Sequence, residues 1–240
     1  RSLTRSERIK SLNTMIITID GPAGSGKSTI ARALAQTLSY TYLDTGAMYR
    51  ALTYRALQEG IALDDEAALS ALAQQERISF IESGAQETRI VIGGLEVSKE
   101  IRTAEVDANV SEVSAHKKVR EELVAQQQGI GRELDLVAEG RDMGSVVFPQ
   151  AEVKVFLTAS PQVRAHRRYL QNLERSKVTP DFDLQSEEEI LRAIIKRDEY
   201  DASREISPLK AADDAHTIDT STLNLQEVLD QIIKLVKGVQ

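Results

Sequence analysis

The sequence predicts an α/β fold in which a five-stranded parallel sheet is flanked by helices in three layers (α/β/α) and carries a small antiparallel β-containing insert. Two observations lead to this prediction. Short apolar runs alternate with segments of helical periodicity along most of the chain, which is typical of parallel strands joined by helices. Near Arg77 the pattern changes, because short strand-like runs follow one another with only turn signals between them.

Five short runs are the predicted strands of the main sheet. The first, MIITID, precedes a glycine-rich loop, and the last, AHTIDTS, precedes the final helix. Their length and their β-branched or apolar residues favour buried strands. The five runs cover residues 15–20, 40–44, 134–140, 152–158 and 215–221.

The helices in the first part of the chain are predicted from their periodicity and their ends. After the glycine-rich loop, apolar residues recur at helical spacing from Ile30 to Leu38. The segment GAMYRALTYRALQEG presents one apolar face and ends at Gly60. The segment EAALSALAQQ is a third helix, with Asp64 or Asp65 as its N-cap.

The predicted insert covers residues 76–100. The runs RISFIES, TRIVIGG and LEVSKEI are short strands, and the turn signals SGAQE and GG lie between them. Residues 103–128 are predicted to be helical, in one or two pieces.

Three later helices have recognisable N-termini. One begins with Ser160 as N-cap and Pro161 at the first helical position. The other two begin with capping boxes, Ser186 with Glu189 and Asn224 with Glu227, and the last helix is expected to end at Gly238.

Composition excludes several kinds of protein. The chain has 240 residues and no Cys, so disulfides, zinc–thiolate sites and thiol nucleophiles are excluded. A formal net charge of −7 argues against a nucleic-acid partner. The sequence contains no run of about eighteen apolar residues, so no membrane span is predicted. Residues 1–14 are basic and polar, without the apolar segment of a secretory signal, and are expected to be a disordered tail.

The glycine-rich loop predicts a nucleoside triphosphate site. Gly21, Gly26, Lys27 and Ser28 fit the pattern G-x-x-x-x-G-K-[ST] between a strand and a helix. Small residues let backbone N–H groups approach phosphate oxygens, and the helix N-terminus adds partial positive charge. Lys27 would bind the outer phosphates, and the Ser28 hydroxyl would be a ligand of Mg²⁺.

Three classes of protein use such a loop. A small-molecule kinase is the first class. A GTP switch is disfavoured because no N-K-x-D segment for guanine is present. A motor or transporter ATPase usually needs a longer chain.

A kinase also needs a second anion site, because two phosphate chains repel each other until cations neutralise them. Arginines and carboxylates follow the ends of predicted elements, where open α/β sheets bind ligands. The three groups are Asp44, Thr45 and Arg50; Glu139, Arg141 and Asp142; and Arg197, Asp201 and Arg204. The last group shares one helical face, and an ion-paired, solvent-exposed face is the alternative explanation for it.

From Met15 onward the chain resembles the bacterial cytidylate (CMP) kinases. The resemblance is carried in order by IDGPAGSGKST, YLDTGAMYRA, VSEVSAHKKVRE, AEGRDMGSVVFP, KRDEYDASR and SPLKAADDAHTIDTS. It implies a P-loop kinase with a helical lid, a monomer in the cytoplasm, that phosphorylates CMP and dCMP from ATP with Mg²⁺. It also implies a core (residues 15–60, 130–160 and 205–240), a monophosphate-binding insert (61–128) and a lid (161–185).

The resemblance implies roles for individual residues. ATP would be bound by Gly21, Pro22, Ala23, Gly24, Ser25, Gly26, Lys27, Ser28 and Thr29, and by one or more of Arg164, Arg167 and Arg168, of which Arg167 is the expected contact. CMP would be bound by Arg50, Arg141 and Arg204 at its phosphate, by Ser111, Arg120 and Asp142 at cytosine, by Arg197 and Asp201 near the ribose, and by Thr45. Lys27, Arg141, Arg197 and Arg204 would be catalytic, with Ser28 as metal ligand and Glu139 beside the Mg²⁺ hydration shell.

The chemistry of the bases supports the assignment to cytosine. A carboxylate such as Asp142 can accept from the N4 amino group of cytosine, and Arg120 can donate to N3. Uracil reverses both polarities, so UMP is expected to be a poor substrate.

One departure from the family concerns Lys117, where many members have Pro. Because Pro is absent at this position, the helix before Arg120 is expected to run straight. Two other functions stay open: a different P-loop kinase, such as one for thymidylate or shikimate, and a nucleotide-binding regulatory protein without transferase activity.

Overall fold

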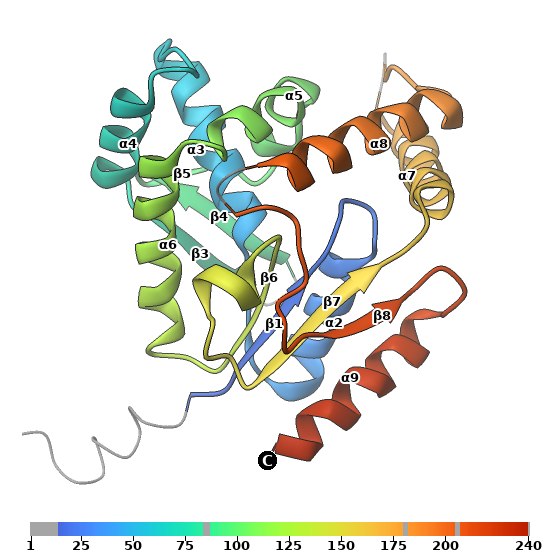
Figure 1. Cartoon of the computed structure of the whole chain (residues 1–240). Coiled ribbons are helices and arrows are strands. Elements are labelled where there is room, and N and C mark those ends of the chain that lie inside the picture. Colours follow the sequence, from blue (N-terminus) through green and yellow to red (C-terminus); the bar gives the residue numbers. More distant parts are fainter. Residues whose placement is uncertain (1–13, 84–86, 180–181, 205–206, 240) are drawn as a thin grey trace, which may run out of the picture. The chain divides into compact units, whose positions relative to one another are not determined.

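The computed structural model of the chain describes residues 14–83, 87–179, 182–204 and 207–239. Five strands form one sheet in the order β2-β6-β1-β7-β8, and three form a second sheet in the order β3-β4-β5 (Figure 1). The strands of the first are β1 (Ile16–Asp20), β2 (Thr41–Asp44), β6 (Leu136–Gly140), β7 (Val153–Thr158) and β8 (His216–Asp219). The predicted five-stranded parallel sheet with helices and a small antiparallel sheet is confirmed. The predicted tail, residues 1–14, lies outside the described residues except for Thr14.

The chain divides into two compact units, each of which is described by itself. One, here called the P-loop unit, contains residues 16–39 and the described residues from 139 onward. The other, here called the insert unit, contains residues 14–15 and the described part of 40–138. The finer division into core, insert and lid stays a prediction.

In the P-loop unit, β7 pairs in parallel with β1 and with β8. Helices α2 (Lys27–Leu38) and α9 (Leu225–Val239) contact each other beside these strands (Figure 1). Both β1 and β7 are buried almost throughout, as expected of strands covered on both faces. Their C-terminal ends continue into the glycine-rich loop and into α7 (Pro161–Ser176), which packs against α8 (Glu187–Ser203).

The insert unit places helices around the three-stranded sheet. Its strands β3 (Ile78–Ser83), β4 (Glu87–Ile92) and β5 (Leu95–Glu96) pair antiparallel. Its helices are α3 (Thr45–Glu59), α4 (Glu66–Gln75), α5 (Ala104–Val113) and α6 (Lys117–Gly131), with a short 3₁₀ helix at Glu100–Arg102. The side chains of Leu52, Leu69, Ile92 and Leu123 are fully buried and form part of its core.

The predicted helix starts are confirmed. Asp65 caps α4, Ser160 caps α7, and Ser186 forms the capping box of α8. At the start of α9, Asn224 Oδ1 accepts from the Glu227 N–H, and the Glu227 carboxylate accepts from the Asn224 N–H. These caps form from residues within one turn, so the sequence alone is sufficient to place them.

Two predictions about helix continuity are wrong. The chain does not run straight before Arg120: α5 ends at Val113 and α6 begins at Lys117. The break is fixed by His116, which has extended backbone angles and whose Nε2 lies 2.7 Å from the Leu63 carbonyl oxygen. At the other end of the chain, α9 continues through Gly238 to Val239.

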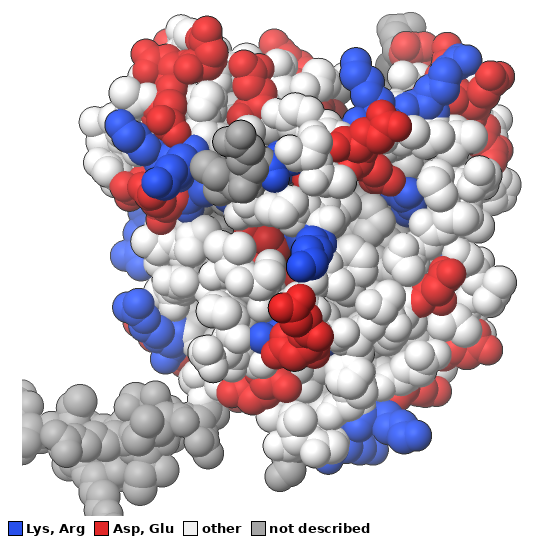
Figure 2. Space-filling model, in the orientation of Figure 1, with Lys and Arg blue, Asp and Glu red and all other residues white. Residues whose placement is uncertain are grey.

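The surface carries charges of both signs. On the face shown in Figure 2, Lys and Arg side chains lie among Asp and Glu side chains, including over α7 and α8 at the upper right. No helix in the described part of the chain has both the length and the apolar composition needed to cross a bilayer.

Candidate active site

The glycine-rich loop requires glycine for steric reasons at two positions. Gly21 has φ of 145°, and a Cβ there would lie 2.0 Å from the carbonyl oxygen of Leu157. Gly24 has φ of 79°, and a Cβ there would lie 3.1 Å from Cβ of Arg164. The loop therefore packs directly on β7 and α7. A larger residue at Gly21 would force the loop away from β7, and one at Gly24 would be strained by the positive φ.

The carbonyl oxygens of this loop are held by side chains from other elements. Arg141 Nη1 donates to Gly21 O at 3.1 Å, Lys27 Nζ to Pro22 O at 2.8 Å, Arg164 Nη1 to Ala23 O at 3.1 Å and Thr220 Oγ1 to Ser25 O at 3.0 Å. In a trans peptide the N–H of the next residue points opposite to the carbonyl. Holding the carbonyls therefore also fixes the directions of the loop N–H groups that would bind phosphate.

Lys27 is buried at the start of α2, with its ammonium group on the Pro22 carbonyl. Burial, together with the positive charge of Arg141, lowers the pKa of Lys27 to about 7. Glu139 and Asp20 act in the opposite direction. Without nucleotide, Lys27 therefore exchanges its proton near neutral pH.

This shift predicts proton uptake when ATP binds. At pH 8 a group with pKa about 7 is mostly neutral, and the phosphates would raise that pKa and draw a proton from the buffer. Calorimetric titration with ATP in buffers of different ionisation enthalpy should show uptake approaching one proton at pH 8 and little at pH 6. The variant Lys27→Met should show none at pH 8. Equal uptake by the variant and the native chain would contradict the assignment to Lys27.

The residues predicted for Mg²⁺ lie together. Ser28 Oγ donates to Glu139 Oε2 at 3.0 Å, so a hydroxyl and a carboxylate face one spot at the start of α2. These are the hard oxygen ligands that Mg²⁺ prefers. Among the described residues, no group of three or more His, Asp or Glu side chains could hold a metal by itself. One hydroxyl and one carboxylate fit Mg²⁺, which usually takes several of its ligands from substrate phosphates and water.

Three of the predicted arginines converge on one carboxylate. Asp201 on α8 lies 3.1 Å from Arg141 Nε, 2.9 Å from Arg204 Nη2 and 3.9 Å from Arg197 Nε. The side chain of Asp201 is only 4% exposed. It therefore does not belong to the ion-paired, solvent-exposed face that was the alternative explanation for this group. Since Arg141 also donates to Gly21 O, this cluster contacts the glycine-rich loop itself. Guanidinium groups gathered in this way are the side chains best suited to bind a phosphate.

Four of the predicted CMP ligands lie in the insert unit. Arg50 on α3 lies 2.5 Å from Asp107 and donates to the Ile101 carbonyl at 3.3 Å. Arg120 on α6 is buried, and its guanidinium carbon lies 5.5 Å from the centre of the Tyr49 ring. Thr45 is buried at the first position of α3, and Ser111 is half-buried on α5. These packing contacts hold the arginines in defined positions on α3 and α6.

Comparison with known proteins identifies the family. The family model described as cytidylate kinase matches residues 17–238. The chain belongs to the cytidylate kinase family. The cytidylate kinase of Shouchella clausii is 46% identical over 92% of this chain and 95% of its own length. That of Bacillus subtilis is 45% identical over 92% and 96%, and that of Halalkalibacterium halodurans is 44% identical over 94% and 99%.

In this cytidylate kinase chain, Asp20 lies directly before the glycine-rich loop and was not among the site residues predicted from the sequence. At the end of β1, its carboxylate accepts from the N–H groups of Met143 and Gly144, both at 2.8 Å. It thereby fixes the start of the short π-helix Met143–Val147 that follows the predicted base-reading residue Asp142. Burial raises the pKa of Asp20 to about 6, opposed by those two hydrogen bonds. A carboxylate at the end of an apolar strand, directly before the loop, was the available signal.

The arginines of the predicted lid differ in their surroundings. Arg164 is buried and paired with Asp198 of α8, whereas Arg168 is exposed. Arg167, the expected ATP contact, donates to the Thr220 carbonyl at 2.5 Å and to its hydroxyl at 3.0 Å. Asp198 and Thr220 are also residues that the sequence reasoning missed.

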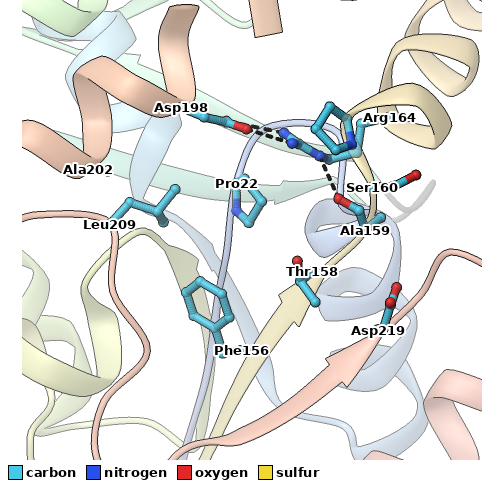
Figure 3. Close-up of a pocket in the computed structure, with 11 residues that line it drawn as sticks. Pro22, Phe156, Thr158, Ala159, Ser160, Arg164, Asp198, Ala202, Leu209 and Asp219 are labelled. Atoms are coloured by element: carbon cyan, nitrogen blue, oxygen red, sulfur yellow. Dashed lines mark hydrogen bonds and ion pairs between the residues drawn. The ribbon is translucent and has the colours of Figure 1, made fainter. Parts of the chain in front are cut away.

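A pocket of about 480 Å³ lies beside the loop in the P-loop unit. Figure 3 shows Pro22 of the loop and Phe156 of β7 in its wall, with Leu209 on one side. The ion pair between Arg164 and Asp198 crosses its upper part.

Proposed function

We propose that this chain transfers the γ-phosphoryl group of ATP to CMP and dCMP, using Mg²⁺, as a monomer in the pyrimidine nucleotide metabolism of the cytoplasm. The observation that carries the proposal is the cluster around Asp201, where Arg141, Arg197 and Arg204 meet beside the loop that carries Lys27. One unit thus combines a triphosphate loop with a second cationic site. Membership of the cytidylate kinase family supports CMP as the acceptor.

The chemistry needs no general base. The nucleophile is a phosphate oxygen of CMP. A phosphate monoester has a second pKa of about 6 and is therefore largely deprotonated at neutral pH. Lys27 would neutralise charge on the outer phosphates of ATP, and Arg141 and Arg204 would neutralise charge on the acceptor phosphate. Ser28 and Glu139 would hold Mg²⁺, which would supply further charge neutralisation. Catalysis is then positioning combined with electrostatic stabilisation.

The family resemblance gives the acceptor contacts residue by residue. Arg50, Arg141 and Arg204 would bind the phosphate, Arg197 and Asp201 would lie near the ribose, and Thr45 would be a further contact. Ser111, Arg120 and Asp142 would read cytosine. The buried carboxylate of Asp142 and the buried guanidinium of Arg120 support this role, because a base of the wrong polarity would leave them unsatisfied.

Substitution of Asp142 tests how the base is read. In Asp142→Ala, kcat/KM for CMP is expected to fall about 10- to 100-fold, while the low value for UMP changes little, because only cytosine donates to this carboxylate. Steady-state kinetics with both monophosphates give the comparison. Equal losses for the two bases would show that Asp142 does not discriminate between them.

A panel of phosphate acceptors with ATP tests the proposed function itself. ADP formation should be fastest with CMP and dCMP, and much slower with UMP, TMP, AMP and shikimate. Rapid transfer to TMP or shikimate would indicate another P-loop kinase. ATP binding without ADP formation from any acceptor would favour a regulatory nucleotide-binding protein.

A further inference from the structure

We infer that Arg164 and Asp198 form a bridge that positions the glycine-rich loop for ATP, so that Arg164 is a positioning residue and not a ligand of the ATP phosphates. The inference rests on the proposed function, because it concerns how the ATP site of that reaction is held in shape. It assigns a role to Asp198, which lies outside the proposed substrate contacts.

The guanidinium of Arg164 is already engaged. Its Nε donates to the Ala159 carbonyl at 2.9 Å, and its Nη1 donates to Ala23 O at 3.1 Å and to Asp198 Oδ1 at 3.1 Å. Its Nη2 donates to Asp198 Oδ2 at 2.5 Å. These bonds use most of the N–H groups of a side chain that is only 3% exposed. One N–H group, on Nη2, is left over, so a bidentate contact with a phosphate would require breaking the ion pair with Asp198.

A second bridge with the same construction lies next to it. Asp201 pairs with Arg141, and Arg141 donates to Gly21 O, just as Asp198 pairs with Arg164, which donates to Ala23 O. The two carboxylates are three residues apart on α8, so they share one face of that helix. The two carbonyls are two residues apart in the loop. One face of α8 thus holds two loop carbonyls through two arginines.

The bridge acts on the peptide between Ala23 and Gly24. With the Ala23 carbonyl held by Arg164, the Gly24 N–H points to the opposite side of the peptide plane. Without this contact the peptide can rotate, because Gly24 has no side chain to restrict it. A carbonyl oxygen turned toward the phosphates would repel them, and one N–H donor would be lost. Loss of the bridge should therefore weaken ATP binding even if Arg164 never touches ATP.

The test compares both ends of the bridge. Binding of the non-hydrolysable analogue AMP-PNP with Mg²⁺ is measured by calorimetry, well below the melting temperature, for Arg164→Met, Asp198→Ala and the double variant. Each single change should raise Kd about tenfold or more. The Kd of the double variant should not exceed that of the single variant that binds less tightly, because both changes remove the same bridge. Arg164→Lys should recover little, because a lysine cannot reach two carbonyls and a carboxylate together. Arg164→Lys also keeps the positive charge beside Asp198, so it serves as a second variant if Arg164→Met does not fold.

Two controls make the result specific. Arg192→Met, which removes an exposed ion pair with Glu188 on α8, should leave Kd unchanged. The assay contains no acceptor, so failure of the chain to phosphorylate CMP would count against the proposed function only. If Asp198→Ala binds AMP-PNP as tightly as the native chain while Arg164→Met does not, Arg164 is a direct ligand and the inference is overturned. Lower melting temperatures with unchanged Kd values would also overturn it.

Discussion

Lys27→Met is expected to lower kcat for phosphoryl transfer to CMP by about 100- to 1,000-fold or more. The side chain is the buried cation of the glycine-rich loop, and Met keeps most of its apolar stem while removing the charge. A preorganised cation in a water-poor site stabilises charge that develops on the transferring group, and a neutral side chain cannot replace it. Steady-state rates with saturating ATP and CMP measure the effect.

The fold should survive this substitution. Burial lowers the pKa of Lys27 to about 7, which means that the folded chain holds this proton less firmly than the unfolded chain does. Between pH 7 and the ordinary lysine value of 10.5, the unfolded state therefore binds more protons, and the free energy of unfolding of the native chain should rise with pH. Lys27→Met should lose this rise. A kcat within about tenfold of the native value would remove Lys27 from the catalytic residues.

Asp201→Asn is expected to have the second-largest effect. Asp201 is the carboxylate that three arginines share, and its replacement removes a negative charge from a buried place beside them. Breaking a buried ion pair typically costs about 3–5 kcal/mol, and the partial exposure of Arg141 and Arg197 favours the lower end of that range. Urea-induced unfolding should give this loss, and KM for CMP should rise because Arg141 and Arg204 lose their positions.

Asp213→Asn is the matched control. Asp213 pairs with Lys210 three residues before it, but its side chain is 98% exposed, so its replacement should change neither stability nor KM. Inorganic phosphate should stabilise Asp201→Asn more than the native chain, since an anion can occupy the place of the carboxylate among the arginines. A free energy of unfolding for Asp201→Asn within about 0.5 kcal/mol of the native value would contradict the shared-carboxylate arrangement.

The sequence by itself determined the elements and the triphosphate loop. The capping box of Ser186 and Glu189 and the N-cap Ser160 could be predicted because each forms from residues within a single helical turn. The spacing of Gly21, Gly26 and Lys27 between a strand and a helix was likewise a local signal. The family resemblance, carried by such short segments, agrees with the family that the comparisons identify.

Only the tertiary structure decided how the charged residues are used. The pattern of Arg197, Asp201 and Arg204, taken alone, favoured a solvated helix face. In the fold Asp201 is buried and pairs with Arg141, which lies 60 positions away. Arg164 meets the Ala23 carbonyl across 141 positions, and the pKa of Lys27 is lowered by burial and by the charge of Arg141, which is distant in the chain. The break before Lys117 depends on His116 reaching Leu63. Burial and the partner of a charge are set by residues that only folding brings together, so no local pattern contains them.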